Sequence, residues 1–215
     1  MIPLDVAMQY ADYARVFESR GVEKALLIKL ALETALRAEE LLKLEWKQFI
    51  IEDDGVAIVS KAGNKGKGNK EYVDKIDHAF YRELLELKSI GNTDNLFTLK
   101  YRTVADMMAK LNTVFGNNDR NYTFHSFKRT SVTMVYLMSG CIITAQRKAR
   151  HNDINTTKKY LKIQEQPISG VISSTMGDNA DLYKNIEHDL LIKCLDKCRL
   201  DMKVVLNKII REELK

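Results

Sequence analysis

The chain has 215 residues, of which 45% are hydrophobic and 29% charged, and its formal net charge is +5 at pH 7. This is the composition of an ordinary soluble globular protein, and no apolar run approaches the roughly 20 residues that a membrane helix needs. The N-terminus lacks a basic region followed by an apolar core, so we expect no secretory signal and a cytoplasmic location. The excess of basic over acidic residues favours an anionic binding partner but does not identify it.

The first expected elements are helices between about residues 22 and 44. Leucines recur there at helical spacing among charged residues, which predicts two amphipathic helices or one helix bent near Thr34 and Ala35. The leucines that carry this pattern are Leu26, Leu30, Leu36, Leu41 and Leu44.

A small sheet is expected next. Residues 49–60 predict short strands around a turn at Asp53-Asp54-Gly55, and a glycine-rich loop over 62–69 precedes a return strand at 71–73. No other segment predicts a sheet. The hairpin also carries a run of lysines, which alone would be interpreted as a solvated basic loop: Lys61, Lys65, Lys67, Lys70 and Lys75.

The remainder is expected to be helical. Helices are predicted at about 77–90, 101–115, 126–139 and 142–149, followed by a short helix from Asn155 to Tyr160. Pro167 and Gly170 then open a linker. From about 181 to 213 the pattern predicts one long helix with a heptad-like apolar seam formed by Leu191, Leu195, Cys198, Met202, Val205 and Ile209. The expected fold class is mainly α with a small antiparallel β-sheet, that is, α+β.

Three cysteines, Cys141, Cys194 and Cys198, are an odd number in a chain without an export signal, so reduced thiols are expected. Cys194 and Cys198 lie four residues apart in a helical pattern, without a second cysteine pair. A zinc site is therefore not expected, and buried core thiols are the better interpretation.

Arg37 is the first residue with possible chemistry. It begins a helix three residues before Glu40, whose carboxylate can hold the guanidinium so that it faces a cleft. A planar guanidinium is well suited to a phosphate diester. In isolation, an ordinary surface Arg–Glu pair explains the same residues.

Two histidines and a tyrosine follow. His125 precedes a helix whose first turn carries Lys128 and Arg129, near the positive end where anions bind. Lys128 shares a face with His125, whereas Arg129 points about 100° around the helix from Lys128. His151 precedes the short helix that ends at Tyr160. Singly, each histidine is equally well explained as a core or surface residue.

In this order, the segments resemble the tyrosine recombinase (phage integrase) family over roughly residues 22–161. Residues 34–46, Thr-Ala-Leu-Arg-Ala-Glu-Glu-Leu-Leu-Lys-Leu-Glu-Trp, are similar to the family's Thr-Gly-Leu-Arg-x-x-Glu-Leu-x-x-Leu-x-Trp segment. Residues 66–71 are similar to the hairpin of Xer-type members. Residues 151–160 match His-x-x-Ile-x-Thr-Thr-x-x-Tyr, the most specific of these motifs.

The chain departs from the family pattern at three positions. Ala35 stands where glycine is usual, and Arg150 stands where glycine often precedes the second histidine. Lys128 stands where the family's His-x-x-Arg box has arginine, and lysine supplies charge without the bidentate fork.

The resemblance implies a catalytic domain over residues 1–165 that breaks and rejoins DNA without a metal, nucleotide or other cofactor. Tyr160 would be the nucleophile, His125 its base, and His151 a hydrogen-bond donor. Either Lys128 or Arg129 would join Arg37 in neutralising the phosphate, with Glu40 supporting Arg37. A hairpin lysine would protonate the leaving oxygen, and both Lys61 and Lys67 stay open, although members with the lysine directly after the strand favour Lys61. The expected DNA contacts are Lys65, Lys67, Lys70, Arg129 and Arg150.

The same resemblance implies partners. They are double-stranded DNA and further copies of the chain in a tetrameric synapse, with no membrane. Residues 166–215 would be a linker and a helical extension that docks on a neighbouring copy or packs on its own core. The family's N-terminal DNA-clamping domain looks absent, so we expect a fragment of a bacterial or phage-encoded integrase whose own DNA binding is weak and salt-sensitive.

Three alternatives remain. A degenerate, non-catalytic DNA-binding relative is supported by Lys128. A type IB topoisomerase-like enzyme would use the same tyrosine chemistry to relax supercoils. A helical interaction module would require every motif to be a coincidence.

Overall fold

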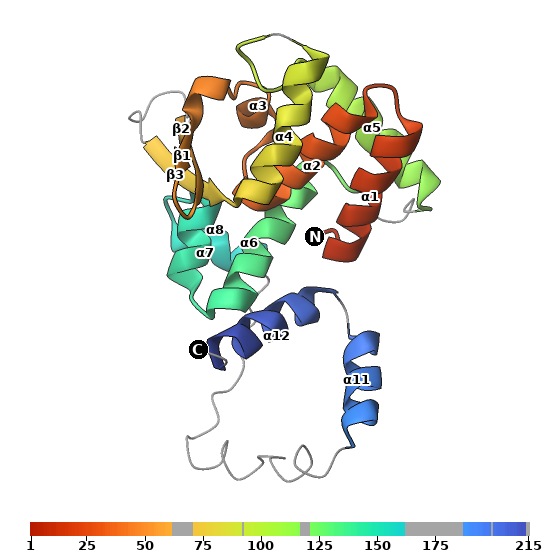
Figure 1. The fold of residues 1–215 in the computed structure, drawn as a ribbon, viewed down its shortest axis with the longest axis vertical. Helices are drawn as coiled ribbons and strands as arrows, with labels where there is room; N and C mark the ends of the chain where they lie inside the picture. The colour runs from red at the N-terminus through yellow and green to blue at the C-terminus, as the bar shows by residue number, and fades with distance from the viewer. Residues whose placement is uncertain (62–70, 92, 117–120, 162–186, 199, 214–215) are drawn as a thin grey trace.

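A computed structural model describes residues 1–61, 71–91, 93–116, 121–161, 187–198 and 200–213 (Figure 1). Its helices are α1 (Leu4–Phe17), α2 (Gly21–Thr34), α3 (Ala38–Leu41), α4 (His78–Ile90), α5 (Tyr101–Val114), α6 (His125–Ser139), α7 (Ile142–Ala149), α8 (Ile154–Leu161), α11 (His188–Lys197) and α12 (Leu200–Glu213), with a 3₁₀ turn η1 at Trp46–Gln48. Its strands are β1 (Phe49–Glu52), β2 (Gly55–Lys61) and β3 (Glu71–Ile76). The predicted fold class, mainly helical with a small antiparallel sheet, is confirmed.

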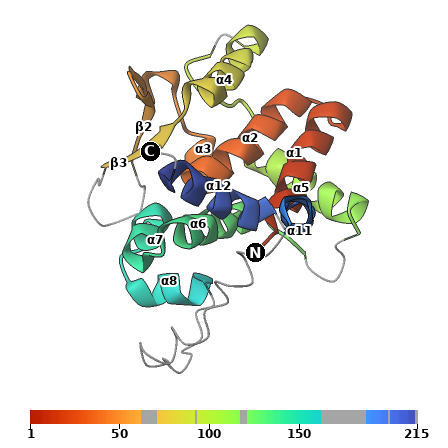
Figure 2. The ribbon, with the colours of Figure 1, turned by 60° about the horizontal axis from the view of Figure 1, so that its bottom comes forward.

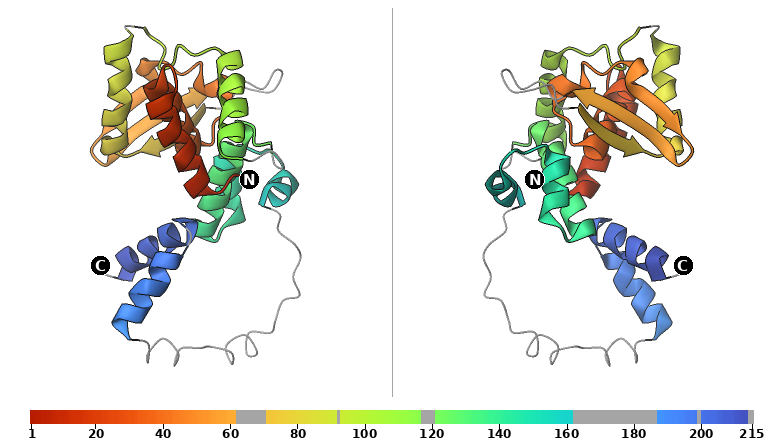
Figure 3. Two further views of the ribbon diagram at one scale, coloured as in Figure 1. Left: turned by 90° about the vertical axis from the view of Figure 1, so that its right-hand side faces the viewer. Right: turned by 90° about the vertical axis from the view of Figure 1, so that its left-hand side faces the viewer.

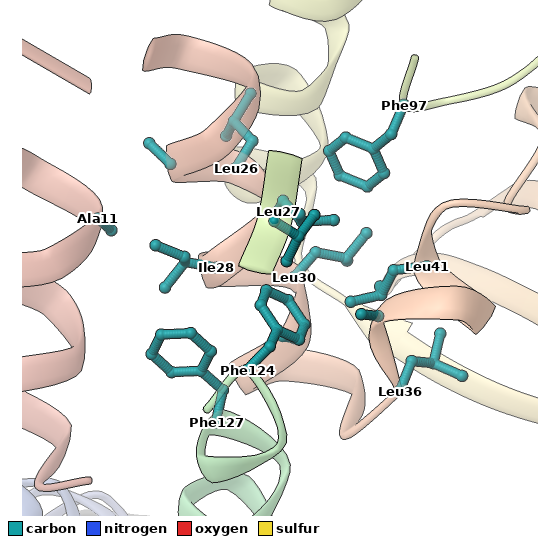
Figure 4. Packing of buried hydrophobic residues seen from close by; sticks show 14 of the residues in the cluster. Ala11, Leu26, Leu27, Ile28, Leu30, Leu36, Leu41, Phe97, Phe124 and Phe127 are labelled. Carbon is teal, nitrogen blue, oxygen red and sulfur yellow. The ribbon is translucent and has the colours of Figure 1, made fainter. Parts of the chain in front are cut away.

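Helix α2 is the centre of the core. It is covered by α1, α4 and α6, and Figure 4 shows aromatic side chains of α6 and of the segment before α5 directed at it. The prediction of an amphipathic helix is wrong here, because neighbours surround α2 and leave it buried on nearly every side. Its fully buried apolar residues are Leu26, Leu27, Ile28, Leu30 and Ala31.

Helix α1 was not predicted, although it packs along α2. Its buried positions are mostly alanine (Ala7, Ala11 and Ala14), which contribute little to a hydrophobic pattern but allow close packing. The fourth is Tyr10, whose hydroxyl donates a hydrogen bond to Asn112 Oδ1 of α5 at 3.1 Å. Helix α1 is therefore part of the core domain.

The sheet has the order β1-β2-β3 with antiparallel neighbours, as predicted. Phe49 lies opposite Ile58, Val56 opposite Ile76, and Lys61 opposite Glu71. Gly55 has φ 152°, and a Cβ there would lie 2.7 Å from the Ile76 carbonyl oxygen, so the turn requires glycine. Figure 3 shows the sheet lying against one side of the helical body, and β3 is joined to α7 by the ion pair between Asp74 and Lys148.

A second, smaller core joins α6, α7 and α8. It consists of Ala35, Val132, Ala145 and Ala149, with Tyr136 and Leu161 packed against it. These small residues let α7 and α8 approach α6 closely. The end of α8 is thereby held near the start of α6.

The predicted long C-terminal helix is wrong. Cys198 is extended (ψ 144°) and separates α11 from α12, and this change of direction lets α12 lie on α1 and α6 (Figure 2). Lys208 Nζ of α12 donates a hydrogen bond to the Met138 carbonyl at 2.7 Å. The predicted linker at Pro167 and Gly170 lies outside the described residues.

Two further predictions concern the burial of the cysteines and the absence of membrane-spanning helices. Cys141 and Cys194 are exposed and Cys198 is only partly buried, so the prediction of buried core thiols is wrong, because α11 has a largely exposed surface. Among the helices that the structure describes, none combines the length and apolar character that crossing a membrane needs.

Leu27→Ala is expected to lower the free energy of unfolding by about 2–5 kcal/mol, because it leaves a cavity in the centre of the core. Leu85→Ala on the exposed face of α4 is the control and should change it by no more than about 0.5 kcal/mol. Urea denaturation measures both. A loss of less than about 1 kcal/mol for Leu27→Ala would contradict the central position of α2.

Candidate active site

Residues from three parts of the sequence converge around Tyr160: Arg37, the start of α6, and the segment from His151 to Tyr160 itself. The Tyr160 hydroxyl is hydrogen-bonded to His125 Nε2 at the start of α6. The His151 ring, between α7 and α8, meets the Tyr160 ring edge-on at 4.6 Å between centroids. Arg129 Cζ lies 5.1 Å from the centre of the Tyr160 ring. The structure thus brings together residues that sequence reasoning had only placed in order.

Arg37 enters this site from the start of α3. Its Nη1 donates to Glu40 Oε1 at 3.2 Å, while its backbone N–H donates to Glu40 Oε2 at 2.7 Å. The side chain of Glu40 is only 15% exposed, whereas that of Arg37 is 46% exposed, so the guanidinium is held yet open to a ligand. Ala35 precedes it in a left-handed conformation (φ 54°), which explains why the resembling family prefers glycine there.

The charge of Arg37 acts on four titratable groups of the site, in addition to the larger effect of their burial. It helps to lower the pKa of three neighbours and opposes the rise in the pKa of Tyr160. The three groups whose pKa it lowers are His125, Lys128 and His151. Arg37 is therefore central to the cluster.

Lys128 is a buried cation that has no hydrogen-bond partner in the part of the chain that the structure describes. The residue is 1% exposed, and within the described residues its Nζ makes no hydrogen bond. Burial, followed by the charge of Arg37, lowers the pKa of Lys128 to about 8. An unpaired ammonium in such a position is costly, so the site favours an incoming anion.

The guanidinium of Arg129 faces the Tyr160 ring. In addition to the contact of its guanidinium with the Tyr160 ring, its Nε is buried and makes no hydrogen bond within the described residues. Both basic residues lower the pKa of His125 through their charge, so the structure leaves Lys128 and Arg129 open as alternatives for the phosphate-binding cation.

His151 is held by two residues that sequence reasoning missed. Its Nδ1 lies 3.1 Å from Thr157 Oγ1, and its carbonyl accepts a hydrogen bond from Gln146 Nε2 at 3.0 Å. Thr157 is fully buried, and its place in the Thr-Thr-x-x-Tyr motif was the available signal. Burial, followed by Lys128, Arg37 and His125, lowers the pKa of His151 to about 4, so its imidazole is neutral at pH 7.

His125 and Tyr160 are in the protonation states that a base and its proton donor need. Burial, followed by the charges of Lys128, Arg37 and Arg129, lowers the pKa of His125, so its imidazole is neutral at pH 7. Burial raises the pKa of Tyr160 above its ordinary value, against the charges of Arg37 and Arg129. The phenol needs a base to become a nucleophile, and a neutral imidazole is in contact with it.

Arg150 is placed elsewhere than expected. Its side chain is 3% exposed and forms an ion pair with Asp74 of β3, and its contact with DNA stays a prediction. Lys61 lies at the end of β2, opposite Glu71, close to the hairpin loop. The other predicted hairpin cations, Lys65, Lys67 and Lys70, lie outside the described residues.

The described residues offer no group of three His, Cys, Asp or Glu side chains arranged to hold a metal ion. The polar groups that converge here are instead cations, imidazoles and one phenol. Such a set can bind a phosphate and activate a nucleophile toward it.

Comparison with known proteins matches the chain to integrases and recombinases. A model of the phage integrase family matches residues 4–166. A probable integrase/recombinase, YopP, derived from the SPbeta prophage of Bacillus subtilis (strain 168), is 26% identical over 176 residues, which cover 78% of this chain and 48% of that protein. Tyrosine recombinase XerA of Saccharolobus solfataricus is 30% identical over 135 residues, 63% of this chain and 44% of that protein.

Solved structures share the fold. The site-specific recombinase XerH, in a post-cleavage complex with a difH substrate, superposes with a TM-score of 0.64 at 20% identity, over 77% of this chain and 50% of that chain. The chain therefore spans about half the length of the curated relatives it matches.

Proposed function

Because the chain belongs to the phage integrase family, we propose that it carries out site-specific DNA recombination or integration through a transient 3′-phosphotyrosyl bond to Tyr160. The observation that carries this proposal is the hydrogen bond between the Tyr160 hydroxyl and His125, inside a cluster of cations. Relatives named integrase and recombinase, and a fold neighbour solved with its substrate DNA, support it.

The proposed cleavage step balances without a cofactor. Tyr160 Oη attacks the phosphorus while His125 Nε2 takes its proton, so a Tyr–O–P bond forms and the P–O5′ bond breaks. The departing 5′ oxygen takes a proton from a hairpin lysine, Lys61 or Lys67. Because the phosphodiester is conserved as a phosphotyrosine, the 5′-hydroxyl of another strand can reverse the step.

The cations stabilise the charge that develops on the phosphate. Arg37 is half exposed and can offer two N–H groups, and the Lys128 ammonium makes no hydrogen bond to any described residue. When the Thr157 hydroxyl donates to His151 Nδ1, the other ring nitrogen carries the proton and can donate it to a non-bridging oxygen.

The proposal includes partners. Double-stranded DNA is the substrate, the full-length protein would carry an N-terminal clamping domain, and four copies would form the synapse in the cytoplasm of a bacterium or phage host. Helix α11 carries the exposed apolar residues Leu190, Leu191 and Ile192, which suit docking on a neighbouring copy. Sedimentation of the chain with and without residues 180–215 tests that docking.

The proposed function is tested by incubation with nicked suicide DNA, from which the broken strand diffuses away and traps a covalent adduct. We expect an adduct on denaturing gels. Relaxation of supercoiled plasmid without strand exchange would favour the topoisomerase-like alternative, and DNA binding without any adduct would favour the degenerate relative.

DNA affinity is expected to fall by about two orders of magnitude or more between roughly 50 and 200 mM salt, because phosphate contacts release counterions. Fluorescence anisotropy with a labelled duplex measures this. A flat response would contradict a phosphate-binding groove.

The pH dependence of adduct formation is expected to be bell-shaped. His125 must be neutral, and its lowered pKa places the acidic limb below about pH 6.5, its ordinary value. Lys128 must be charged, and its pKa of about 8 places the alkaline limb there in the free protein. Single-turnover rates at subsaturating DNA between about pH 5 and 10 report the free protein.

Lys128→Arg is the matched variant for the pH dependence of adduct formation. Because arginine stays charged at these pH values, the alkaline limb should move above about pH 9. An alkaline limb that stays in place would assign it to another group.

A further inference from the structure

Arg150 makes two contacts with strand β3. Its Nη2 forms an ion pair with Asp74 Oδ2, and its Cζ lies 4.9 Å from the centre of the Tyr72 ring. The Arg150 side chain is 3% exposed and that of Asp74 is 9% exposed, so solvent is largely excluded from the pair. Lys148 of α7 adds a second ion pair, with its Nζ 2.8 Å from Asp74 Oδ1. Charge-assisted contacts of this kind fix the geometry of the groups that they join.

The contact with Tyr72 lies next to the end of strand β2. Tyr72 pairs with Ser60 in the ladder, and the next pair is Lys61 with Glu71. Arg150 therefore contacts the hairpin one residue pair before Lys61, which is one of the two candidates for the lysine that protonates the leaving oxygen. The other candidate lies in the loop that follows Lys61 in the chain.

Arg150 also precedes His151 directly in the chain. The backbone N–H and carbonyl of His151 are both hydrogen-bonded to Gln146, at 3.2 and 3.0 Å. The His151 ring lies 4.6 Å from the ring of Tyr160, measured between centroids. The side chain of Arg150 thus contacts the hairpin, while its backbone continues into the segment that holds the nucleophile.

We propose that Arg150 is a positioning residue that fixes the hairpin relative to His151 and Tyr160, so that a hairpin lysine reaches the departing 5′ oxygen. The inference rests on the proposed function, in which Lys61 or Lys67 supplies that proton. Because a misplacement of about 1 Å can slow a reaction on the order of 100-fold, a contact near the end of the hairpin affects the rate strongly. The resembling family often has glycine at this position, which has no side chain for such a contact.

A DNA substrate with sulfur in place of the bridging 5′ oxygen separates the leaving-group step from the rest of the reaction. With oxygen, the P–O5′ bond breaks and the departing alkoxide takes a proton from the lysine. With sulfur, the P–S bond breaks and releases a thiolate, which needs no proton because a thiol has a pKa of about 8.5. Tyr160 gives its proton to His125 in both reactions. Sulfur therefore rescues only a defect in protonation of the leaving group.

Arg150→Gly is the principal variant, because glycine adopts the left-handed backbone of this position (φ 58°) without strain. Lys148 still holds Asp74 in this variant, so β3 keeps one ion pair with α7. The single-turnover rate of adduct formation should fall roughly 10- to 100-fold with the oxygen substrate. With the sulfur substrate it should stay within about threefold of the wild-type rate. Arg147→Ala, which removes an exposed cation from the same helix, should leave both rates unchanged.

Lys61→Met and Lys67→Met identify the acid and test its dependence on Arg150. The variant that lacks the acid should be slow with the oxygen substrate and should react at the wild-type rate with the sulfur substrate. Addition of Arg150→Gly to that variant should slow the oxygen reaction by no more than about threefold further, because the lysine that Arg150 positions is already absent.

Equal slowing of Arg150→Gly with both substrates would overturn the proposal, because Arg150 would then bind the phosphate or only stabilise the fold. An unchanged rate with the oxygen substrate would also overturn it. The same holds if sulfur rescues neither lysine variant, since the hairpin would then supply no acid to position. If the wild type forms no adduct with either substrate, the proposed function itself is contradicted and this inference fails with it.

Discussion

Tyr160→Phe is expected to abolish covalent adduct formation, lowering its rate by at least about a thousandfold. The phenylalanine keeps the ring that packs against His151 and Arg129 but lacks the oxygen that would attack the phosphate. The lost hydrogen bond to His125 should cost only about 0.5–1.5 kcal/mol of stability. DNA affinity should remain within about threefold of the wild type, because phosphate contacts dominate it.

Tyr136→Phe is the matched control. Tyr136 is partly buried on α6 against the second core cluster, away from the His125 hydrogen bond. It should form the adduct at the wild-type rate. An adduct that persists in Tyr160→Phe would assign the nucleophile to another residue.

Arg37→Ala is expected to reduce the single-turnover rate by about 100- to 1,000-fold, the typical effect of removing one preorganised donor to a developing negative charge. Arg37 is the one residue whose charge is felt by both histidines, by Lys128 and by Tyr160 among the described groups. Its exposed pair with Glu40 contributes at most about 1 kcal/mol, so the fold should survive.

Arg37→Lys should recover only a small part of the rate, because lysine lacks the two parallel N–H groups that match a phosphate. Arg102→Ala on the exposed face of α5 serves as the control for loss of one positive charge. A rate for Arg37→Ala within about threefold of the wild type would contradict the central position of this guanidinium.

The parts of the fold that were predicted correctly have strong local signals. The hairpin of β1 and β2 follows from short apolar runs on both sides of Asp53-Asp54-Gly55, and α6 ends at Gly140, which is left-handed as a C-cap glycine should be. Helix α1 was missed because its buried face is mostly alanine. The break between α11 and α12 was missed because the heptad-like spacing continues through it, while tertiary packing on α1 and α6 decides where the chain turns.

The order of the site residues along the chain was predictable, but their electrostatics were not. No pattern in the sequence shows that Lys128 is buried without a hydrogen-bond partner among the described residues, or that Arg150 is paired with Asp74 seventy-six residues away. Both depend on how β3 lies against the segment before His151. The contact of Thr157 with His151 was predictable only in part, because the motif identifies the threonine but not the residue that it contacts.

The most direct measurement is mass spectrometry of the DNA-linked peptide recovered from the suicide-substrate reaction. The expected product is a peptide carrying Tyr160 joined to a 3′-phosphate. Attachment at any other residue, or to a 5′-phosphate, would contradict the proposed cleavage chemistry.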